Sequence, residues 1–293
     1  TFAKAFCGHG NEAVIMAAFI YSQSGYKMRL GRDCEKLYLL YGSKHGIYEK
    51  GYIVIEGINY YPLDDKVERM EISDFSFPQE QSMSLYIENA QKFTIRPSAK
   101  RKLASEQYHD VTIDSQVNLN LIQFYNTYPS SEVNGNFMTR WKMYADTPMD
   151  ESVSQMLYPD IKNKIEGLSD VQAVNQILNW VQTAFQYEYD DKVWGHDRAF
   201  FAEETLYYPY CDCEDRAILF TRLVRDLLGL KCILVYYPGH LASAVCLKQQ
   251  VNGDYISLDG DVYTICDPTY IGAPVGITMP EMDNRSAKVI KLL

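Results

Sequence analysis

The chain has 293 residues, of which 47% are hydrophobic and 23% charged, as expected for a globular protein of about two domains. It carries 28 basic and 38 acidic residues, a formal net charge of −10, and no lysine and arginine cluster long enough to follow a phosphate backbone. This composition argues against nucleic acid and anionic membrane surfaces as partners, and no apolar run reaches the length of a membrane span.

The cysteines bear on cofactors and on compartment. There are seven, an odd number at irregular spacing, so we expect no complete disulfide framework and at least one free thiol. Cys211 and Cys213 form one Cys-x-Cys pair without a second pair or a neighbouring histidine pair, so we predict no metal site and no cofactor. No signal-peptide pattern precedes Thr1, so either a leader was removed or the chain begins inside a longer protein. A removed leader would favour the cell envelope or periplasm over the cytoplasm, and no oligomeric state is predicted.

The first half of the chain predicts a helix followed by strands. Residues 13–24 have a helical pattern that Gly25 ends, and residues 52–60 predict a hairpin. Residues 67–152 change character, because short alternating runs there are separated by turn residues. We expect this segment to be β-rich, with a tight turn at Asn134-Gly135, and to carry no chemistry.

The helical pattern returns after residue 152. Residues 161–165 form a short apolar piece, and residues 171–185 predict a longer helix. Its apolar face carries Val174, Ile177, Leu178, Val181 and Phe185.

Residues 217–229 predict the helix around which the second half of the chain is organised. Apolar residues recur at spacings of three and four, and Gly229 stands where a C′ glycine ends a helix. Cys213 therefore lies in the first turn, where free amide N–H groups and the helix dipole favour a thiolate. The adjacent Glu214 and Asp215 disfavour it, and a small packing cysteine at a helix start is the alternative interpretation.

Two further polar residues follow at strand boundaries. His240 opens the strand-like run 240–247, and Asp267 ends the run 263–266. A cysteine at a helix start, then a histidine at a strand start and an aspartate at a strand end, is the order that a thiol hydrolase needs.

Three sequence blocks carry a family resemblance. They are Cys213-Glu214-Asp215-Arg216-Ala217, Gly239-His240 and Asp267-Pro268-Thr269. They resemble the signature blocks of the transglutaminase-like superfamily, in particular its bacterial cysteine-protease type, over roughly residues 153–293. The resemblance implies an α+β, papain-like core in which the catalytic helix packs on an antiparallel sheet. Many members follow the histidine with alanine and tryptophan, whereas Leu241-Ala242 stands here.

The resemblance also implies a role for each site residue. Cys213 would be the nucleophile, His240 the base and then the acid, and Asp267 the carboxylate that orients His240. The backbone N–H of Cys213 should help to hold the oxyanion, together with an aromatic donor, for which Tyr187 and Trp194 are the candidates. Cys211 is the alternative nucleophile, but Cys213 is the cysteine that directly precedes the two acids, as in the family.

Matches at a constant spacing indicate an internal duplication. Ala13, Gly25 and Lys27 match Ala217, Gly229 and Lys231 at an offset of 204 residues, and residues 52–60 match 255–263 at 203. Cys7 then corresponds to Cys211, His9 to Cys213 and Asp64 to Asp267, while His240 corresponds to a position near Lys36 or, with a gap, to His45.

The duplication predicts three parts. Residues 1–66 would be a degenerate, non-catalytic copy of the transglutaminase-like unit, truncated at its start. Residues 67–152 would be a β-rich connecting segment, and residues 153–293 the catalytic domain.

The predicted chemistry is attack of the Cys213 thiol on a peptide or carboxamide carbonyl, which gives a thioester. We favour hydrolysis of that thioester, which makes the protein a cysteine peptidase or amidase with a peptide or protein substrate. A transglutaminase that cross-links or deamidates protein glutamine is one alternative. A non-catalytic module that binds peptides or glycans is another.

Overall fold

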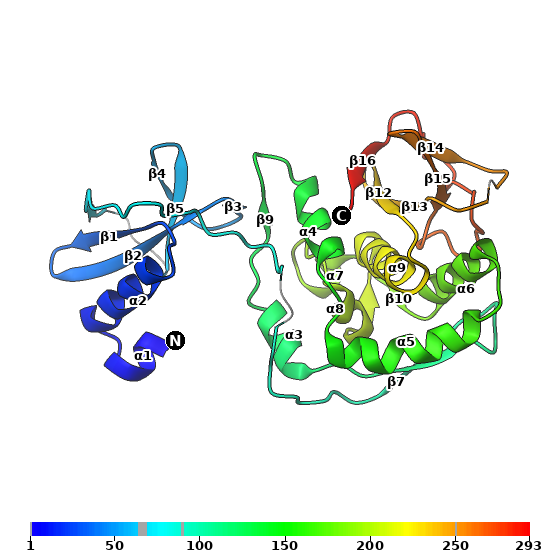
Figure 1. The fold of residues 1–293 in the computed structure, drawn as a ribbon, viewed down its shortest axis with the longest axis horizontal. Helices are drawn as coiled ribbons and strands as arrows, with labels where there is room; N and C mark the ends of the chain where they lie inside the picture. The colour runs from blue at the N-terminus through cyan, green and yellow to red at the C-terminus, as the bar shows by residue number, and fades with distance from the viewer. Residues whose placement is uncertain (1, 64–68, 89–90, 250) are drawn as a thin grey trace. The chain divides into compact units, whose positions relative to one another are not determined.

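The computed structural model describes residues 2–63, 69–88, 91–249 and 251–293. It combines helices with mostly antiparallel sheets and is therefore of the α+β class, as predicted (Figure 1). The chain forms two compact units, the first from residues 1–86 and 129–137 and the second from residues 87–128 and 138–293. Each unit contains one five-stranded antiparallel sheet.

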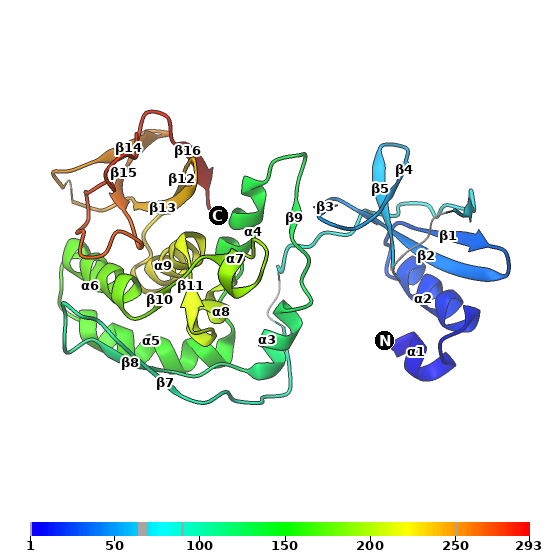
Figure 2. The same ribbon diagram turned by 180° about the vertical axis from the view of Figure 1, so that it is seen from behind.

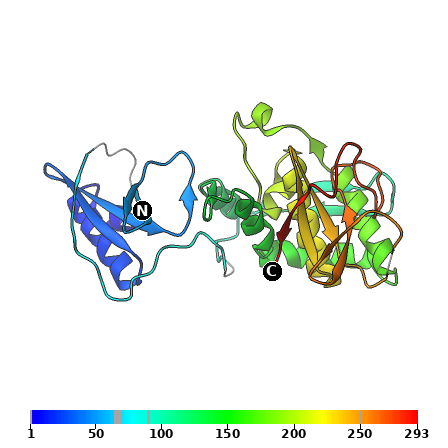
Figure 3. The same ribbon diagram turned by 90° about the horizontal axis from the view of Figure 1, so that it is seen from above.

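The first unit is a sheet with helices on one side. Its strands run in the order β4-β5-β2-β1-β6, with the bounds β1 (Met28–Asp33), β2 (Lys36–Ser43), β4 (Ile53–Ile55), β5 (Ile58–Pro62) and β6 (Glu71–Ile72). Helix α2 (Asn11–Gln23) packs along β1 and β2 (Figure 3), and the shorter α1 (Phe2–Cys7) packs against α2. A two-stranded pair, β3 (Gly46–Ile47) with β9 (Ser131–Glu132), completes the unit.

The second unit is built on a sheet of the same strand order. Its strands run β14-β15-β13-β12-β16, with the bounds β12 (Cys232–Tyr237), β13 (His240–Val245), β14 (Tyr255–Leu258), β15 (Asp261–Cys266) and β16 (Lys288–Lys291). Helix α9 (Cys213–Leu228) packs on β12 and β13 and against α6 (Asp170–Thr183). Figure 2 shows α9 between this sheet and α5 (Glu151–Ile165).

Short helices and strands surround this frame. They are α3 (Leu119–Tyr125), α4 (Met138–Asp146), α7 (Asp190–Val193), α8 (Ala202–Tyr207), β7 (Arg101–Ala104), β8 (Thr112–Ser115), β10 (Gln186–Tyr187) and β11 (Tyr210–Cys211). β7 pairs with β8 as an antiparallel hairpin, and β10 pairs with β11 in parallel.

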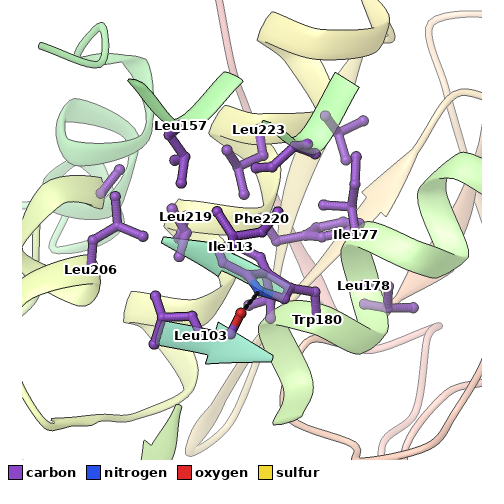
Figure 4. Close-up of a cluster of buried hydrophobic side chains, with 14 of the residues drawn as sticks. Leu103, Ile113, Leu157, Ile177, Leu178, Trp180, Leu206, Leu219, Phe220 and Leu223 are labelled. Carbon is purple, nitrogen blue, oxygen red and sulfur yellow. Dashed lines mark hydrogen bonds between the residues drawn. The ribbon is translucent and has the colours of Figure 1, made fainter. Parts of the chain in front are cut away.

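The main hydrophobic core of the second unit lies between α5, α6, α9 and the β7–β8 hairpin (Figure 4). Its largest fully buried side chain is Trp180, whose indole N–H donates to the Leu103 carbonyl at 3.1 Å. The apolar stripe of α9 enters this core with Leu219, Phe220 and Leu223. Each such side chain contributes roughly 1.5–3 kcal/mol when fully buried, so the core holds α9, and with it Cys213, firmly in place.

The two five-stranded sheets share register as well as strand order. Met28 lies opposite Tyr41 in β1 and β2, and the residues 204 positions further on, Cys232 and Val245, lie opposite each other in β12 and β13. The hairpins β4–β5 and β14–β15 also have the same register, at an offset of 203. A duplicated unit would produce equal registers of this kind.

The boundaries of the units differ from the three predicted parts. Residues 67–152 form no separate segment, because β6 adds to the first sheet while α3, α4, β7 and β8 belong to the second unit. Helix α4 packs on α9 and β16, and burying its apolar side draws it into that unit. The apolar piece predicted at residues 161–165 is the end of the 15-residue α5, which continues through Pro159. Asn134-Gly135 forms the predicted turn, with φ of 55° and 68°.

Candidate active site

A buried histidine–aspartate pair lies on two neighbouring strands of the second sheet. His240 is the first residue of β13, directly after the turn at Pro238-Gly239, and Asp267 directly follows β15. The two strands pair antiparallel, which brings the side chains together, and His240 Nε2 lies 2.8 Å from Asp267 Oδ2. Both residues are almost wholly buried, at 7% and 2% exposure.

The Asp267 carboxylate is oriented by the backbone that follows it. Its Oδ1 accepts hydrogen bonds from the N–H groups of Thr269, at 2.9 Å, and Tyr270, at 3.2 Å. Oδ2 is then directed at His240, and because an ionised carboxylate can only accept, Nε2 of the ring is the donor. In the neutral ring Nδ1 therefore carries the lone pair, and it is the atom that can take a proton.

Cys213 brings a thiol to the same place. It is the first residue of α9, after the N-cap residue Asp212, and α9 packs against β13. The backbone N–H of Leu241, which follows His240, interacts with the Cys213 thiol and lowers its pKa. The start of α9 thus faces the start of β13, so the predicted cysteine, histidine and aspartate gather in one region of the second unit.

The electrostatics around Cys213 disfavour the thiolate. Burial raises the pKa of the Cys213 thiol well above its usual value, and the carboxylates of Glu214 and Asp212 raise it further. The thiol donates to Glu214 Oε2 at 3.3 Å. These effects outweigh the helix dipole and the Leu241 N–H, so in the resting site the thiol is neutral.

Of the two predicted oxyanion donors, Tyr187 is the one that interacts electrostatically with the Cys213 thiol. It stands opposite Cys211 in the β10–β11 pair, and negative charge on Cys213 and Asp212 adds to burial in raising the pKa of its hydroxyl. Trp194 instead packs in an aromatic group with Phe200, Tyr208 and the Arg198 guanidinium. Tyr187 is therefore the candidate that the fold brings to the site.

No protein-family model, curated protein or solved structure matches this chain. Within the described ranges, no helix is both long and apolar enough to cross a membrane. The function therefore rests on the geometry of the second unit and on the three sequence blocks that meet there.

Carboxylates gather at the start of α9. Three overlapping groups have ligand atoms within 4.8 Å of one another: Asp212, Cys213 and Glu214; Asp190, Asp212 and Asp215; and Asp190, Asp197 and Glu214. Burial raises the pKa of Asp190 to about 6 and also raises those of Asp212 and Asp215. Oxygen ligands of this kind can hold a hard cation such as Ca²⁺ or Mg²⁺. Cysteine and histidine spacing, from which we predicted no metal, does not detect acids that the fold brings together.

Cys211, the alternative nucleophile, points into the interior. It is 3% exposed, and burial raises the pKa of its thiol to about 12. Arg216 donates from Nε to its sulfur at 3.4 Å. Cys213, in contrast, is partly exposed, so it is the accessible cysteine of the pair.

Two residues around the site had no predicted role. Arg216 is fully buried and donates to the carbonyls of Gln182 and Phe185 at the end of α6. The side chain of Gln182 binds the loop that follows β15. The sequence does contain a signal for Gln182, which lies four residues after Leu178 and therefore on the apolar side of the helix. A polar side chain at such a position needs hydrogen-bond partners inside the protein.

The first unit lacks the same set of groups among its described residues. Lys36 starts β2 in the register position that His240 has in β13, so the ungapped match, rather than His45, is the equivalent one. His9, at the position of Cys213, is exposed before α2, and Asp64 lies outside the described residues. His45 is buried elsewhere, with Nδ1 3.3 Å from Ser131 Oγ.

Proposed function

We propose that this protein is a cysteine peptidase or amidase of the transglutaminase-like superfamily, with a papain-like core in its second unit. The observation that carries the proposal is the buried contact between His240 Nε2 and Asp267 Oδ2, with the Cys213 thiol beside the next residue, Leu241. A thiol at a helix start, packed against a sheet that supplies the histidine and the acid, supports the finer fold assignment.

The proposed reaction passes through a thioester. His240 Nδ1 takes the proton of the Cys213 thiol as Sγ attacks the substrate carbonyl, and Asp267 stabilises the imidazolium that forms. The carbon–nitrogen bond then breaks, and the imidazolium returns its proton to the departing amine. Water, deprotonated by His240, attacks the thioester, releases the acid and restores the thiol.

Two donors support the negative oxygen that forms during both steps. The backbone N–H of Cys213 is free at the first turn of α9, where amide groups have no partner within the helix. The Tyr187 hydroxyl has a raised pKa, so it stays protonated at neutral pH and can donate. The resting thiol is also protonated, so proton transfer to His240 accompanies attack instead of preceding it.

The first test is alkylation of each cysteine by iodoacetamide across pH, mapped by mass spectrometry. We expect Cys213 to be alkylated in the folded wild type, and the alkylation rate to fall in His240→Ala and in Asp267→Asn. Cys211→Ala is the matched control, because its buried thiol should contribute nothing to the signal. Equal alkylation of Cys213 in wild type and His240→Ala would contradict the proposal.

A second test identifies the acceptor. Casein is incubated with the protein and a fluorescent primary alkylamine, and the products are analysed for new amino termini, released ammonia and bound fluorophore. New amino termini that are absent with Cys213→Ala support a peptidase. Fluorophore on casein would instead assign a transglutaminase, and unchanged binding of casein without turnover would assign a recognition module.

A further inference from the structure

Gln182 occupies an unusual place at the end of α6. Its side chain is buried, at 1% exposure, and points at the loop that follows β15. Its Nε2 lies 2.9 Å from the carbonyl oxygens of Asp267 and Tyr270 and 3.0 Å from that of Ala273. Its Oε1 accepts from the backbone N–H of Gly272 at 3.1 Å. One side chain thus satisfies four backbone groups of a loop distant in sequence.

The chemistry of this contact requires an amide. Three carbonyl oxygens converge on Nε2 and share its two hydrogens, while Oε1 at the other end of the group accepts, and an amide supplies both functions. A glutamate has the same shape but presents oxygens on both sides, so a carboxylate would repel the three carbonyls. A methionine has similar length but leaves the buried carbonyls without a donor, which is unfavourable because buried polar groups need hydrogen-bond partners.

The loop that Gln182 holds carries the acid of the site. The backbone carbonyl of Asp267 accepts from Gln182 Nε2, while its side chain contacts His240. The N–H of Tyr270 orients the Asp267 carboxylate, and the Tyr270 carbonyl is also held by Gln182. The amide therefore restrains both the residue that contacts His240 and a residue that aims its carboxylate.

Gln182 is also tied to the helix that carries the thiol. Its backbone carbonyl accepts from Arg216 at 3.0 Å, and Arg216 lies on α9 three residues after Cys213. Arg216 further donates to the Phe185 carbonyl at 2.7 Å. Through its backbone Gln182 contacts the thiol-bearing helix, and through its side chain it contacts the loop of Asp267.

We propose that Gln182 is the positioning residue that sets the His240–Asp267 pair in register with the Cys213 helix. The inference rests on the proposed function, because the register matters for proton transfer between Cys213 and His240. Gln182 touches neither the thiol nor a substrate in this role. It acts through Asp267, whose orientation decides which nitrogen of His240 carries the proton.

The test compares two variants of Gln182 with a matched control. Gln182→Glu keeps the shape and removes the donors, and Gln182→Met removes them without adding charge. Asn175→Ala is the control, because Asn175 lies on the same helix and accepts from Val275 in the same loop, at 2.9 Å, but does not contact Asp267. Circular dichroism and thermal melting monitor the fold of all three.

Two readouts separate positioning from general stability. We expect the His240-dependent alkylation of Cys213 to fall about 10- to 100-fold in both Gln182 variants, as for a small displacement of a reacting group. The ¹⁵N chemical shifts of the His240 ring should show that the ring no longer prefers the Nε2–H tautomer. Asn175→Ala should lower the melting temperature but change neither the alkylation rate of Cys213 nor the His240 tautomer. When His240→Ala is already present, adding Gln182→Met should not slow the alkylation of Cys213 further.

Each outcome decides the inference. Folded Gln182 variants with the wild-type His240 tautomer and the wild-type rate of Cys213 alkylation would overturn it, as would variants that lose the helical signal altogether, since Gln182 would then be a folding residue. If His240→Ala leaves Cys213 alkylation unchanged, the proposed function fails instead. The His240 tautomer still reports, independently of catalysis, whether Gln182 positions Asp267.

Discussion

At the scale of single residues, burial and the neighbouring acids raise the pKa of the Cys213 thiol. These acids are Glu214 and Asp212, which flank the thiol. A helix start usually favours a thiolate, so the local sequence places two opposing influences on one sulfur. Burial and the acids prevail because partial burial disfavours the charged form of the thiol and the neighbouring negative charges disfavour it further.

Glu214→Gln should make the thiol more reactive. The substitution removes the adjacent negative charge and keeps a carbonyl oxygen that can accept from the thiol, so the thiolate becomes less unfavourable. We expect the pH profile of Cys213 alkylation to move to lower pH and the rate at pH 7 to rise several-fold. Glu166→Gln, an exposed acid at the end of α5, is the control and should leave the profile unchanged. Slower alkylation of Cys213 in Glu214→Gln than in wild type would contradict this explanation of the thiol pKa.

Glu203 should make the stability of the protein depend on pH. This glutamate is 1% exposed, and burial raises its pKa to about 7 from an ordinary 4.5. The folded state therefore holds this proton more tightly than the unfolded chain, so its contribution to stability is complete below pH 4.5. That contribution is lost as pH rises from 4.5 through 7.

Glu203→Gln should remove this dependence. The glutamine can still accept from the Asp150 N–H, which lies 2.5 Å from Glu203 Oε1. The free energy of unfolding of the variant minus that of wild type should be larger at pH 8 than at pH 5. The increase should be up to about 3 kcal/mol, at about 1.36 kcal/mol per pKa unit. Urea unfolding at the two pH values measures the gain, with the exposed Glu151→Gln as control. A gain of equal size at both pH values would mean that Glu203 is ionised throughout.

At the scale of elements, α9 is defined at both ends by local chemistry. The N-cap residue Asp212 donates its backbone N–H to Asp215 Oδ2 at 3.2 Å, and Gly229 ends the helix in the left-handed conformation, with φ of 64°. The same helix supplies Cys213 at its first residue and Arg216 in the next turn, so its position and phase decide the geometry of the site. Open space surrounds Gly229, with no atom within 4 Å of an added Cβ.

Gly229→Ala should destabilise the protein through the backbone alone. A Cβ in the left-handed region costs roughly 1–2 kcal/mol and meets no neighbour here. We expect the free energy of unfolding of the second unit to fall by about 1 kcal/mol, measured by denaturant unfolding. Gly51→Ala is the matched control, because Gly51 also has open space around it but does not adopt a positive φ, and it should change stability little.

At the scale of the whole molecule, the chain forms two units, each with a five-stranded antiparallel sheet of the same strand order. The first has buried side chains around Met28 and Leu39 and around Tyr41 and Tyr61, whereas the second has the larger core in which Trp180 is buried. Among the described residues, the second unit is where the cysteine, the histidine and the aspartate gather. We therefore expect substitutions in the core of the first unit to lower its stability without changing the reactivity of Cys213.

Large-to-small substitutions in the two cores should test this separation. Leu40 in the first unit and Leu219 in the second are both completely buried, so Leu40→Ala and Leu219→Ala should each cost about 2–5 kcal/mol. Hydrogen exchange followed by mass spectrometry should show faster exchange confined to the unit that carries the substitution. Leu219→Ala should also slow the alkylation of Cys213, since Leu219 holds α9, and Leu40→Ala should not. Equal loosening of both units by either variant would mean that they unfold as one.

The sequence by itself determined the features that arise from neighbouring residues. The apolar stripe and Gly229 predict α9 because helical periodicity and a left-handed end are local properties. Turn chemistry predicts the turn at Asn134-Gly135, which the structure contains. The matches at an offset of 204 residues are also visible in the sequence, because they are comparisons of local patterns.

Only the tertiary structure decided which distant groups meet. The contact of His240 with Asp267 depends on strand pairing, and the four partners of Gln182 belong to a loop some ninety residues further along, at distances that periodicity does not encode. The acids around α9 come together from residues 190–215 for the same reason. The division of residues 67–152 between the units likewise follows from burial of apolar surface, which depends on the whole fold and not on any local pattern.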